Sequence, residues 1–336
     1  MDKKYIKRNM NELVDAVLVK VDPHYQNQND VYIEKSRKDI EYTILFTLEC
    51  VHSKDESILI HYYTWLIETL KHYNIRQRTL FNMLDAINLV LKPYLSVDEI
   101  HFLTQIDETV IKDALKEVQD QTYINNPASE IYLTYLIKKD RLGAVNYINS
   151  LIEANYDIRK IYLDIIQPSM YEIGRLWQAR KLSVADEHMA TVITQYVMTS
   201  LYPYIFKSEK NGMRLVSVSL GSEQHEIGMR MVTDLFEYEG YETHYLGSNI
   251  PIQDIVNYVD IHKPNILAIS ITLSVHLSSL KQCVSMIRSN KNLNNMKILI
   301  GGQAISKYSD PIHTFNVDGF ALNANDAIKE GERLAK

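Results

Sequence analysis

Residues 215–228 read LVSVSLGSEQHEIG, and this stretch decides the fold of the last third of the chain. The apolar, β-branched half predicts a buried strand, and the residues after it carry apolar side chains at helical spacing. His225 therefore lies in a loop between a strand and a helix. In an open α/β sheet such loops lie at the carboxyl ends of the strands, where ligands bind. His225 is a candidate ligand-binding residue, and the simpler interpretation is a solvated or structural loop histidine.

The whole segment 212–336 alternates short strands with helices. We expect strands at 214–220, 242–246, 265–271, 297–300 and 317–321. We expect helices at about 226–239, 252–262, 277–290 and 325–335. Such alternation predicts a parallel, doubly wound sheet. Five short repeats of this length indicate a flavodoxin-like five-stranded parallel sheet domain.

The rest of the chain reads as helical, so the fold class is α and α/β. Apolar periodicity predicts an N-terminal helical domain at 1–122, in which Tyr62, Tyr63 and Trp65 are expected to pack in the core. A four-helix bundle is expected at 128–206, with helices near 129–139, 141–154, 157–177 and 184–202. Ser183 and Asp186 have the spacing of a capping box at the start of the last helix. Polar segments at 121–127 and 207–212 separate the three domains.

Composition narrows the functional classes. The net charge of −6 argues against a general nucleic-acid binder, which needs basic patches to neutralise phosphates. The two cysteines, Cys50 and Cys283, are too far apart in sequence for a metal-binding CxxC pair. We see neither a signal peptide nor a membrane span, and we expect a cytoplasmic protein.

Polar and small residues follow the other predicted strands. Gly247 follows the second strand, Ser270 and Thr272 end the third, and Gly301 and Gly302 end the fourth. These residues are expected at the same edge of the sheet as His225. The glycines permit close backbone approach to a ligand. A neutral imidazole is a good ligand for cobalt or iron, and a nearby carboxylate such as Glu223 can fix its tautomer.

Taken together, Glu223-x-His225-x-x-Gly228, Ser270-x-Thr272 and Gly301-Gly302 resemble the cobalamin-binding domain. The resemblance implies that the dimethylbenzimidazole tail of the cofactor leaves cobalt and inserts beside the sheet. His225 would then be the lower axial ligand of the cobalt. Gly228 would let the tail pass the first helix, and the residues after the third and fourth strands would line its cavity. Glu223 stands where the family usually has Asp, which also offers a carboxylate.

Residues 168–177 (PSMYEIGRLW) and 184–191 (VADEHMAT) resemble the four-helix cap that covers the upper corrin face. Trp177 followed by Glu187-His188 is similar to the CarH-type photoreceptor regulators, which bind adenosylcobalamin. The resemblance implies that the tryptophan packs over the adenosyl group and that Glu187 and His188 contact it. The plainer interpretation is a core tryptophan and a solvated helix start. Gln178 departs from the light-sensing members, which have histidine there, and residues 1–122 lack their winged-helix DNA-binding domain.

The main functional hypothesis is therefore a non-enzymatic adenosylcobalamin sensor, responsive to light through cleavage of the Co–C bond. Its output would go to a protein partner, for example a transcription regulator, or to a homo-oligomer, without direct binding to DNA or a membrane. The alternative is a corrinoid methyl-carrier protein of a methyltransferase system, with methylcobalamin or hydroxocobalamin. A mutase is disfavoured because the chain has no room for a substrate-binding barrel. No catalytic residue is assigned.

Overall fold

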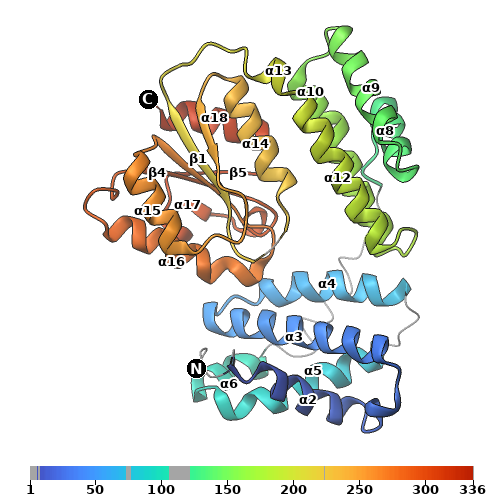
Figure 1. Ribbon diagram of the computed structural model, residues 1–336. Helices are drawn as coiled ribbons and strands as arrows, with labels where there is room; N and C mark the ends of the chain where they lie inside the picture. Colours follow the sequence, from blue (N-terminus) through green and yellow to red (C-terminus); the bar gives the residue numbers. More distant parts are fainter. Residues whose placement is uncertain (1–5, 7, 73–76, 106–121, 223, 336) are drawn as a thin grey trace. The chain divides into compact units, whose positions relative to one another are not determined.

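The computed structural model describes residues 6, 8–72, 77–105, 122–222 and 224–335 (Figure 1). The chain divides into two compact units, Met1–Asp120 and Gln121–Lys336. Glu223 lies outside the described residues. Within the part that is described, no helix is both long enough and apolar enough to cross a membrane.

The first unit is helical, as its periodicity predicts. Its helices are α2 (Met10–Val21), α3 (Asp30–Ser53), α4 (Ser57–His72), α5 (Gln77–Leu91) and α6 (Val97–Gln105). Short 3₁₀ turns at Tyr25–Asn27 and Lys92–Tyr94 follow α2 and α5, where Pro23 and Pro93 interrupt the helical pattern. Asn29 caps α3, because its side chain accepts a hydrogen bond from the Tyr32 backbone N–H at 2.9 Å.

The aromatic cluster of α3 and α4 follows the prediction only in part. Tyr62 and Tyr63 are buried, and Tyr62 stacks on Phe46 with ring centroids 4.2 Å apart. Core packing was the wrong prediction for Trp65, which is 41% exposed. The buried face of α4 is already occupied by Tyr62 and by Leu66 one turn later, so Trp65 falls at the border of that face.

The second unit begins with a helical bundle, which we call the cap. It contains α8 (Pro127–Ile137), α9 (Arg141–Glu153), α10 (Ile158–Lys160), the π-helical turn η3 (Ile161–Ile166), α11 (Gln167–Gln178), α12 (Val184–Ser200) and α13 (Tyr202–Ile205). The helix expected at 157–177 is thus interrupted by a π turn. Pro168 follows this turn and has no N–H to donate to the carbonyl four residues earlier, so the sequence does carry a signal for irregular helix geometry here. The capping box is confirmed: Ser183 and Asp186 bond each other's backbone N–H groups at the start of α12.

The sheet has five parallel strands in the order β2-β1-β3-β4-β5, the flavodoxin-like order that the sequence predicts. The strands are β1 (Arg214–Ser219), β2 (Glu242–Tyr245), β3 (Ile266–Ser270), β4 (Lys297–Gly301) and β5 (Gly319–Ala321). Their register aligns Ser219, Ser270, Gly301 and Ala321 in one row across the sheet. The carboxyl ends of four strands therefore meet at one edge.

Helices cover both faces of the sheet, as expected for strands as apolar as β1 and β3 (Figure 1). On one face α14 (Ile227–Tyr238) packs beside α18 (Ala324–Leu334), and on the other α15 (Ile252–His262) packs beside α16 (Leu277–Ser289). The short elements α17 (Pro311–Phe315), η4 (Ser274–His276) and η5 (Ile305–Lys307) complete the loops. Because α14 starts two residues after His225, this helix fixes where the histidine loop ends.

Candidate functional site

A cavity of about 110 Å³ lies beside the carboxyl ends of β3, β4 and β5. Four of the residues singled out in the sequence line it: Gly228, Ser270, Gly301 and Gly302. The remaining wall from this part of the fold is mainly apolar and comes from α14, the three strands and α18. The structure thus brings together residues that lie more than seventy positions apart, at the edge where an open α/β sheet binds its ligands.

The three glycines of the cavity wall have different surroundings. A Cβ at Gly228 would meet no other atom within 4 Å, so this position faces open space. A Cβ at Gly301 would lie 2.9 Å from the Ala321 carbonyl oxygen. At Gly302, with φ +98°, a Cβ would collide with the Ile271 carbonyl. Gly302 is therefore required by the close approach of neighbouring backbone, whereas Gly228 leaves room for a ligand.

The loop that bears His225 is held by contacts on both sides of the exposed histidine. Next to it, the Glu226 carboxylate accepts a hydrogen bond from the Ser248 hydroxyl, and the Glu226 carbonyl lies 3.5 Å from the Tyr245 hydroxyl. Burial raises the pKa of Tyr245 to about 12, so its hydroxyl stays protonated and can donate. On the other side, the Asn249 N–H donates to the Gly221 carbonyl at 3.1 Å.

Two further predicted residues lie on the same edge of the sheet but outside the cavity wall. Gly247 has φ +80°, and its carbonyl accepts the Ser219 N–H at 3.0 Å. Thr272 follows β3 and is half-buried. Sequence reasoning missed His276, whose ring packs against Gly221 beside the histidine loop. This contact depends on the tertiary packing of the loop after β3, and no local sequence pattern predicts it.

The predicted upper-face residues lie at the junction of two neighbouring cap helices. Trp177 is half-buried near the end of α11, and Glu187 and His188 lie in the first turns of α12. The His188 ring Nδ1 is 2.7 Å from a Glu187 carboxylate oxygen, and the Thr191 hydroxyl donates to the other oxygen at 3.2 Å. Glu187 and His188 thus form a pair on the cap, and Gln178 ends the helix that carries Trp177.

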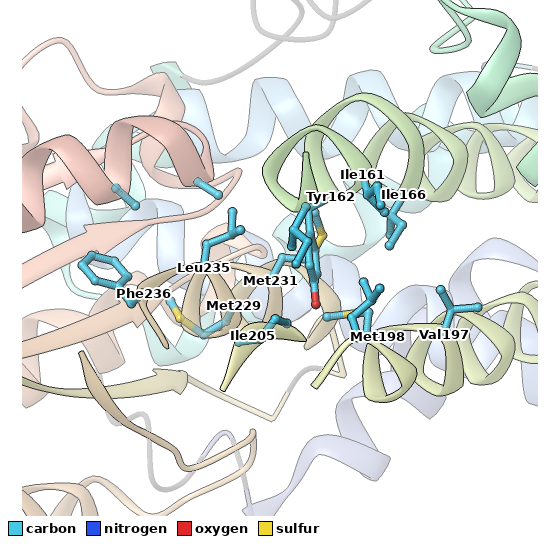
Figure 2. Close-up of a cluster of buried hydrophobic side chains, with 14 of the residues drawn as sticks. Ile161, Tyr162, Ile166, Val197, Met198, Ile205, Met229, Met231, Leu235 and Phe236 are labelled. Atoms are coloured by element: carbon cyan, nitrogen blue, oxygen red, sulfur yellow. The ribbon is translucent and has the colours of Figure 1, made fainter. Parts of the chain in front are cut away.

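The cap is attached to the sheet domain along α14. Figure 2 shows cap side chains from η3 and α12 packed with side chains of α14, among them Tyr162, Met198, Met229 and Leu235. Within this apolar cluster the Tyr162 hydroxyl donates to Asp234 Oδ2 at 2.8 Å, and both residues are buried. Burial raises the pKa of Asp234 to about 7, although the Tyr162 bond and the nearby Arg230 charge oppose that shift.

Two arginines make further polar contacts at this junction. Arg230 of α14 donates to the Thr199 hydroxyl at 2.9 Å and to the Tyr202 hydroxyl at 3.0 Å. Arg159 of α10 pairs with Glu239, which follows α14 directly. The helix that begins beside His225 therefore contacts both the cavity and the cap. The sequence analysis did not identify Asp234 as a residue of this junction. The signal that could have indicated it is a carboxylate next to the apolar positions of an amphipathic helix.

Comparisons with known proteins identify this region. Residues 128–202 match one family model described as a B12 binding domain, and residues 213–324 match a second with the same description. Both segments are thus similar to B12 binding domains. They indicate a cobalamin or other corrinoid cofactor, and the open space at Gly228, the cavity beside the sheet and the histidine at its edge fit such a group.

Relatives of this region include corrinoid proteins. The chain is 24% identical over 166 residues to dimethylamine corrinoid protein 1 of Methanosarcina acetivorans. The aligned residues cover 49% of this chain and 75% of the relative. It is 25% identical over 207 residues to monomethylamine corrinoid protein 2 of the same organism, covering 60% and 94%. The monomethylamine corrinoid protein of Methanosarcina barkeri has the same fold, with a TM-score of 0.55 and 19% identity over 61% of this chain and 98% of that one.

These relatives correct part of the sequence analysis. Cobalamin binding is supported, whereas the CarH-type photoreceptor and transcription regulation are not. The CarH-type assignment rests on Trp177 with Glu187-His188, and these relatives do not support that finer assignment. The second hypothesis, a methyl-carrying corrinoid protein, is the one that the relatives favour.

Proposed function

We propose that this chain is the corrinoid-carrying protein of a methyl-transfer system. The observation that supports this proposal most is the match of both the cap and the sheet domain to B12 binding domains, with methylamine corrinoid proteins as relatives. The cavity at the sheet edge, lined by Gly228, Ser270, Gly301 and Gly302, gives the proposal a physical site. In this function the chain carries the cofactor and leaves catalysis to its partners.

His225 would hold the cobalt from the lower side of the corrin. Neutral imidazole is a suitable ligand for this metal, and the exposed position of His225 leaves the ring accessible. When bound, a corrinoid supplies a cobalt centre that can accept and release a methyl group. Glu226, held by Ser248 and beside Tyr245, would keep the backbone of the histidine loop in place. Glu223 remains the proposed carboxylate partner of the imidazole.

The cavity beside the sheet would take the nucleotide tail. Its apolar walls exclude water from a flat base, and the Ser270 hydroxyl, from a side chain that is only 9% exposed, can bond a ring nitrogen. Gly228 leaves the entrance beside α14 free of side-chain atoms. Thr272 and Gly247, on the same edge, would lie near the corrin rather than the tail.

The cap would cover the upper face, with Trp177, Glu187 and His188 as its proposed contacts. A methyl carrier has to expose this face to methyltransferases, so its partners are proposed to be such enzymes. A methyl carrier and an adenosylcobalamin regulator differ in the upper ligand of the cobalt that they accept. A regulator of that kind would discriminate strongly for adenosylcobalamin, whereas a carrier has to accept methylcobalamin and hydroxocobalamin.

The test is binding and transfer with the full chain. Purified protein is titrated with methylcobalamin, hydroxocobalamin and adenosylcobalamin, and the visible spectrum is followed in the dark and after green light. The proposal expects methylcobalamin to bind and its methyl group to pass to a thiol acceptor when a cognate methyltransferase is added. Exclusive binding of adenosylcobalamin, with a light-driven change of spectrum and oligomeric state, would contradict the carrier function.

A further inference from the structure

Three residues of the cap line the same cavity as the residues of the sheet edge. They are Leu163 in η3 and Gln167 and Tyr171 in α11. Their spacing of four and four residues places them on one face of consecutive helical turns. A cap that served only the upper corrin face would have no need of side chains at the tail cavity.

The cap side of the cavity is held in place by one buried hydrogen bond and by contacts nearer the surface. Tyr162, next to Leu163, donates its hydrogen bond to Asp234 of α14. Gln167 Nε2 donates to the Tyr171 hydroxyl at 3.1 Å, which joins the two polar members of the face. The Tyr171 ring meets Tyr123 edge-on at 5.3 Å, and the Tyr123 N–H donates to the buried Glu172. The helix face formed by Leu163, Gln167 and Tyr171 is thus held next to Leu163 at one end and at Tyr171 at the other.

The depth of the cavity is mainly apolar, whereas its cap side carries the polar side chains of Gln167 and Tyr171. Among the described residues that line the cavity there is no Lys or Arg, so polar recognition falls to neutral groups. The volume of about 110 Å³ is of the order of the roughly 150 Å³ that accommodates benzene in an engineered cavity. A cavity of this size takes little more than one aromatic ring, so part of the two-ring base and the rest of the nucleotide arm, with its ribose and phosphate oxygens, have to lie along the wall. Gln167 and Tyr171 offer an amide N–H and a phenol O–H for such oxygens.

We propose that Gln167 and Tyr171 of the cap bind the nucleotide arm of cobalamin, so that the cap recognises the tail of the cofactor directly. The inference rests on the proposed corrinoid-carrying function. It adds a specificity determinant: corrinoids that carry the nucleotide arm are preferred over those that lack it, and the preference depends on cap residues. Binding of the tail would also favour the arrangement of the cap in which these side chains face the cavity.

The experiment compares cobalamin with cobinamide, which has the same ring and cobalt but no nucleotide arm. Dissociation constants are measured by spectrophotometric titration for the wild type, for Tyr171→Phe and for the double variant Gln167→Leu/Tyr171→Phe. The matched control is Gln195→Leu/Tyr196→Phe on α12, where Tyr196 is 55% exposed and neither residue lines the cavity. Tyr171→Phe removes only a hydroxyl from a side chain that is half exposed, so it keeps the test valid if the double variant fails to fold.

The expected result is that the double variant weakens cobalamin binding about tenfold while cobinamide binding stays as in the wild type. The control should retain the wild-type preference for cobalamin. Equal weakening for both ligands, or no weakening in either variant, would overturn the inference and leave the proposed function intact. A wild-type protein that binds neither ligand would instead overturn the proposed function on which the inference depends.

Discussion

Gly228 and Gly302 both line the cavity beside the sheet, but a methyl group meets different surroundings at each. At Gly302 it would strike the Ile271 carbonyl from a backbone with φ +98°, while at Gly228 it would enter open space. Gly302→Ala should therefore lower the free energy of unfolding by roughly 1–3 kcal/mol. Gly228→Ala should leave stability unchanged or raise it by up to about 1 kcal/mol, because alanine is the better helix former.

The two substitutions also differ in their effect on ligand binding. Gly228→Ala should weaken cobalamin binding about tenfold, because the added methyl group occupies space that the tail would use. Urea denaturation and spectrophotometric titration of the same preparations measure both quantities. A Gly228→Ala protein that is as stable as the wild type and binds cobalamin equally well would show that the tail does not pass this position.

Asp234 predicts a dependence of stability on pH. Burial raises its pKa from 3.8 to about 7 in the folded protein, so between these values the folded state binds more protons than the unfolded state. The free energy of unfolding must then fall as pH rises through this window, by roughly 4 kcal/mol for the full shift. Asp234→Asn keeps an acceptor for Tyr162 and removes the titration. Relative to the wild type, the variant should gain stability from about pH 4 to about pH 8 in urea denaturation; parallel curves would show that Asp234 does not titrate there.

At the scale of elements, the start of α12 depends on a reciprocal cap. The Ser183 side chain accepts the Asp186 N–H at 3.1 Å, and Asp186 accepts the Ser183 N–H at 2.9 Å. Ser183→Ala should lower the free energy of unfolding by about 1 kcal/mol, whereas Ser183→Thr, which keeps the hydroxyl, should stay close to the wild type. Since Glu187 and His188 lie in the turns that this cap fixes, the alanine variant should also bind the corrinoid more weakly. Equal stability of the two variants would argue against the cap.

The elements themselves were largely predictable, and their exceptions have physical causes. Apolar runs and periodicity placed the five strands and their parallel order, because the central strands β1 and β3 are buried on both faces and helices separate the strands. The π turn at Ile161–Ile166 was not predicted: Pro168 signals an irregularity within the expected helix, but it does not specify which kind of turn forms. For the site, strand ends and a family resemblance located Gly228, Ser270, Gly301 and Gly302. Gln167 and Tyr171 could not be identified from the sequence as cavity-lining residues. They lie on a helix face of mixed polarity, and only the packed structure shows that this face lines the cavity.

At the scale of the molecule, the two compact units suggest a division of roles. Both segments that match B12 binding domains lie within Gln121–Lys336, and the helical unit Met1–Asp120 lies outside the matched residues. A fragment of residues 121–336 should therefore fold alone and bind cobalamin with the affinity of the full chain. Circular dichroism and titration check this. A fragment that folds but binds more than about tenfold more weakly would show that the N-terminal unit contributes to the site.

The account depends most on His225 as the lower ligand of cobalt. The direct measurement is electron paramagnetic resonance of the cob(II)alamin complex, with protein grown on histidine labelled with the heavy nitrogen isotope. If His225 ligates the metal, each cobalt line is split into three by ordinary histidine nitrogen and into two by the heavy isotope, and His225→Ala abolishes the effect. A splitting that the label leaves unchanged, or that persists in His225→Ala, would contradict the assignment.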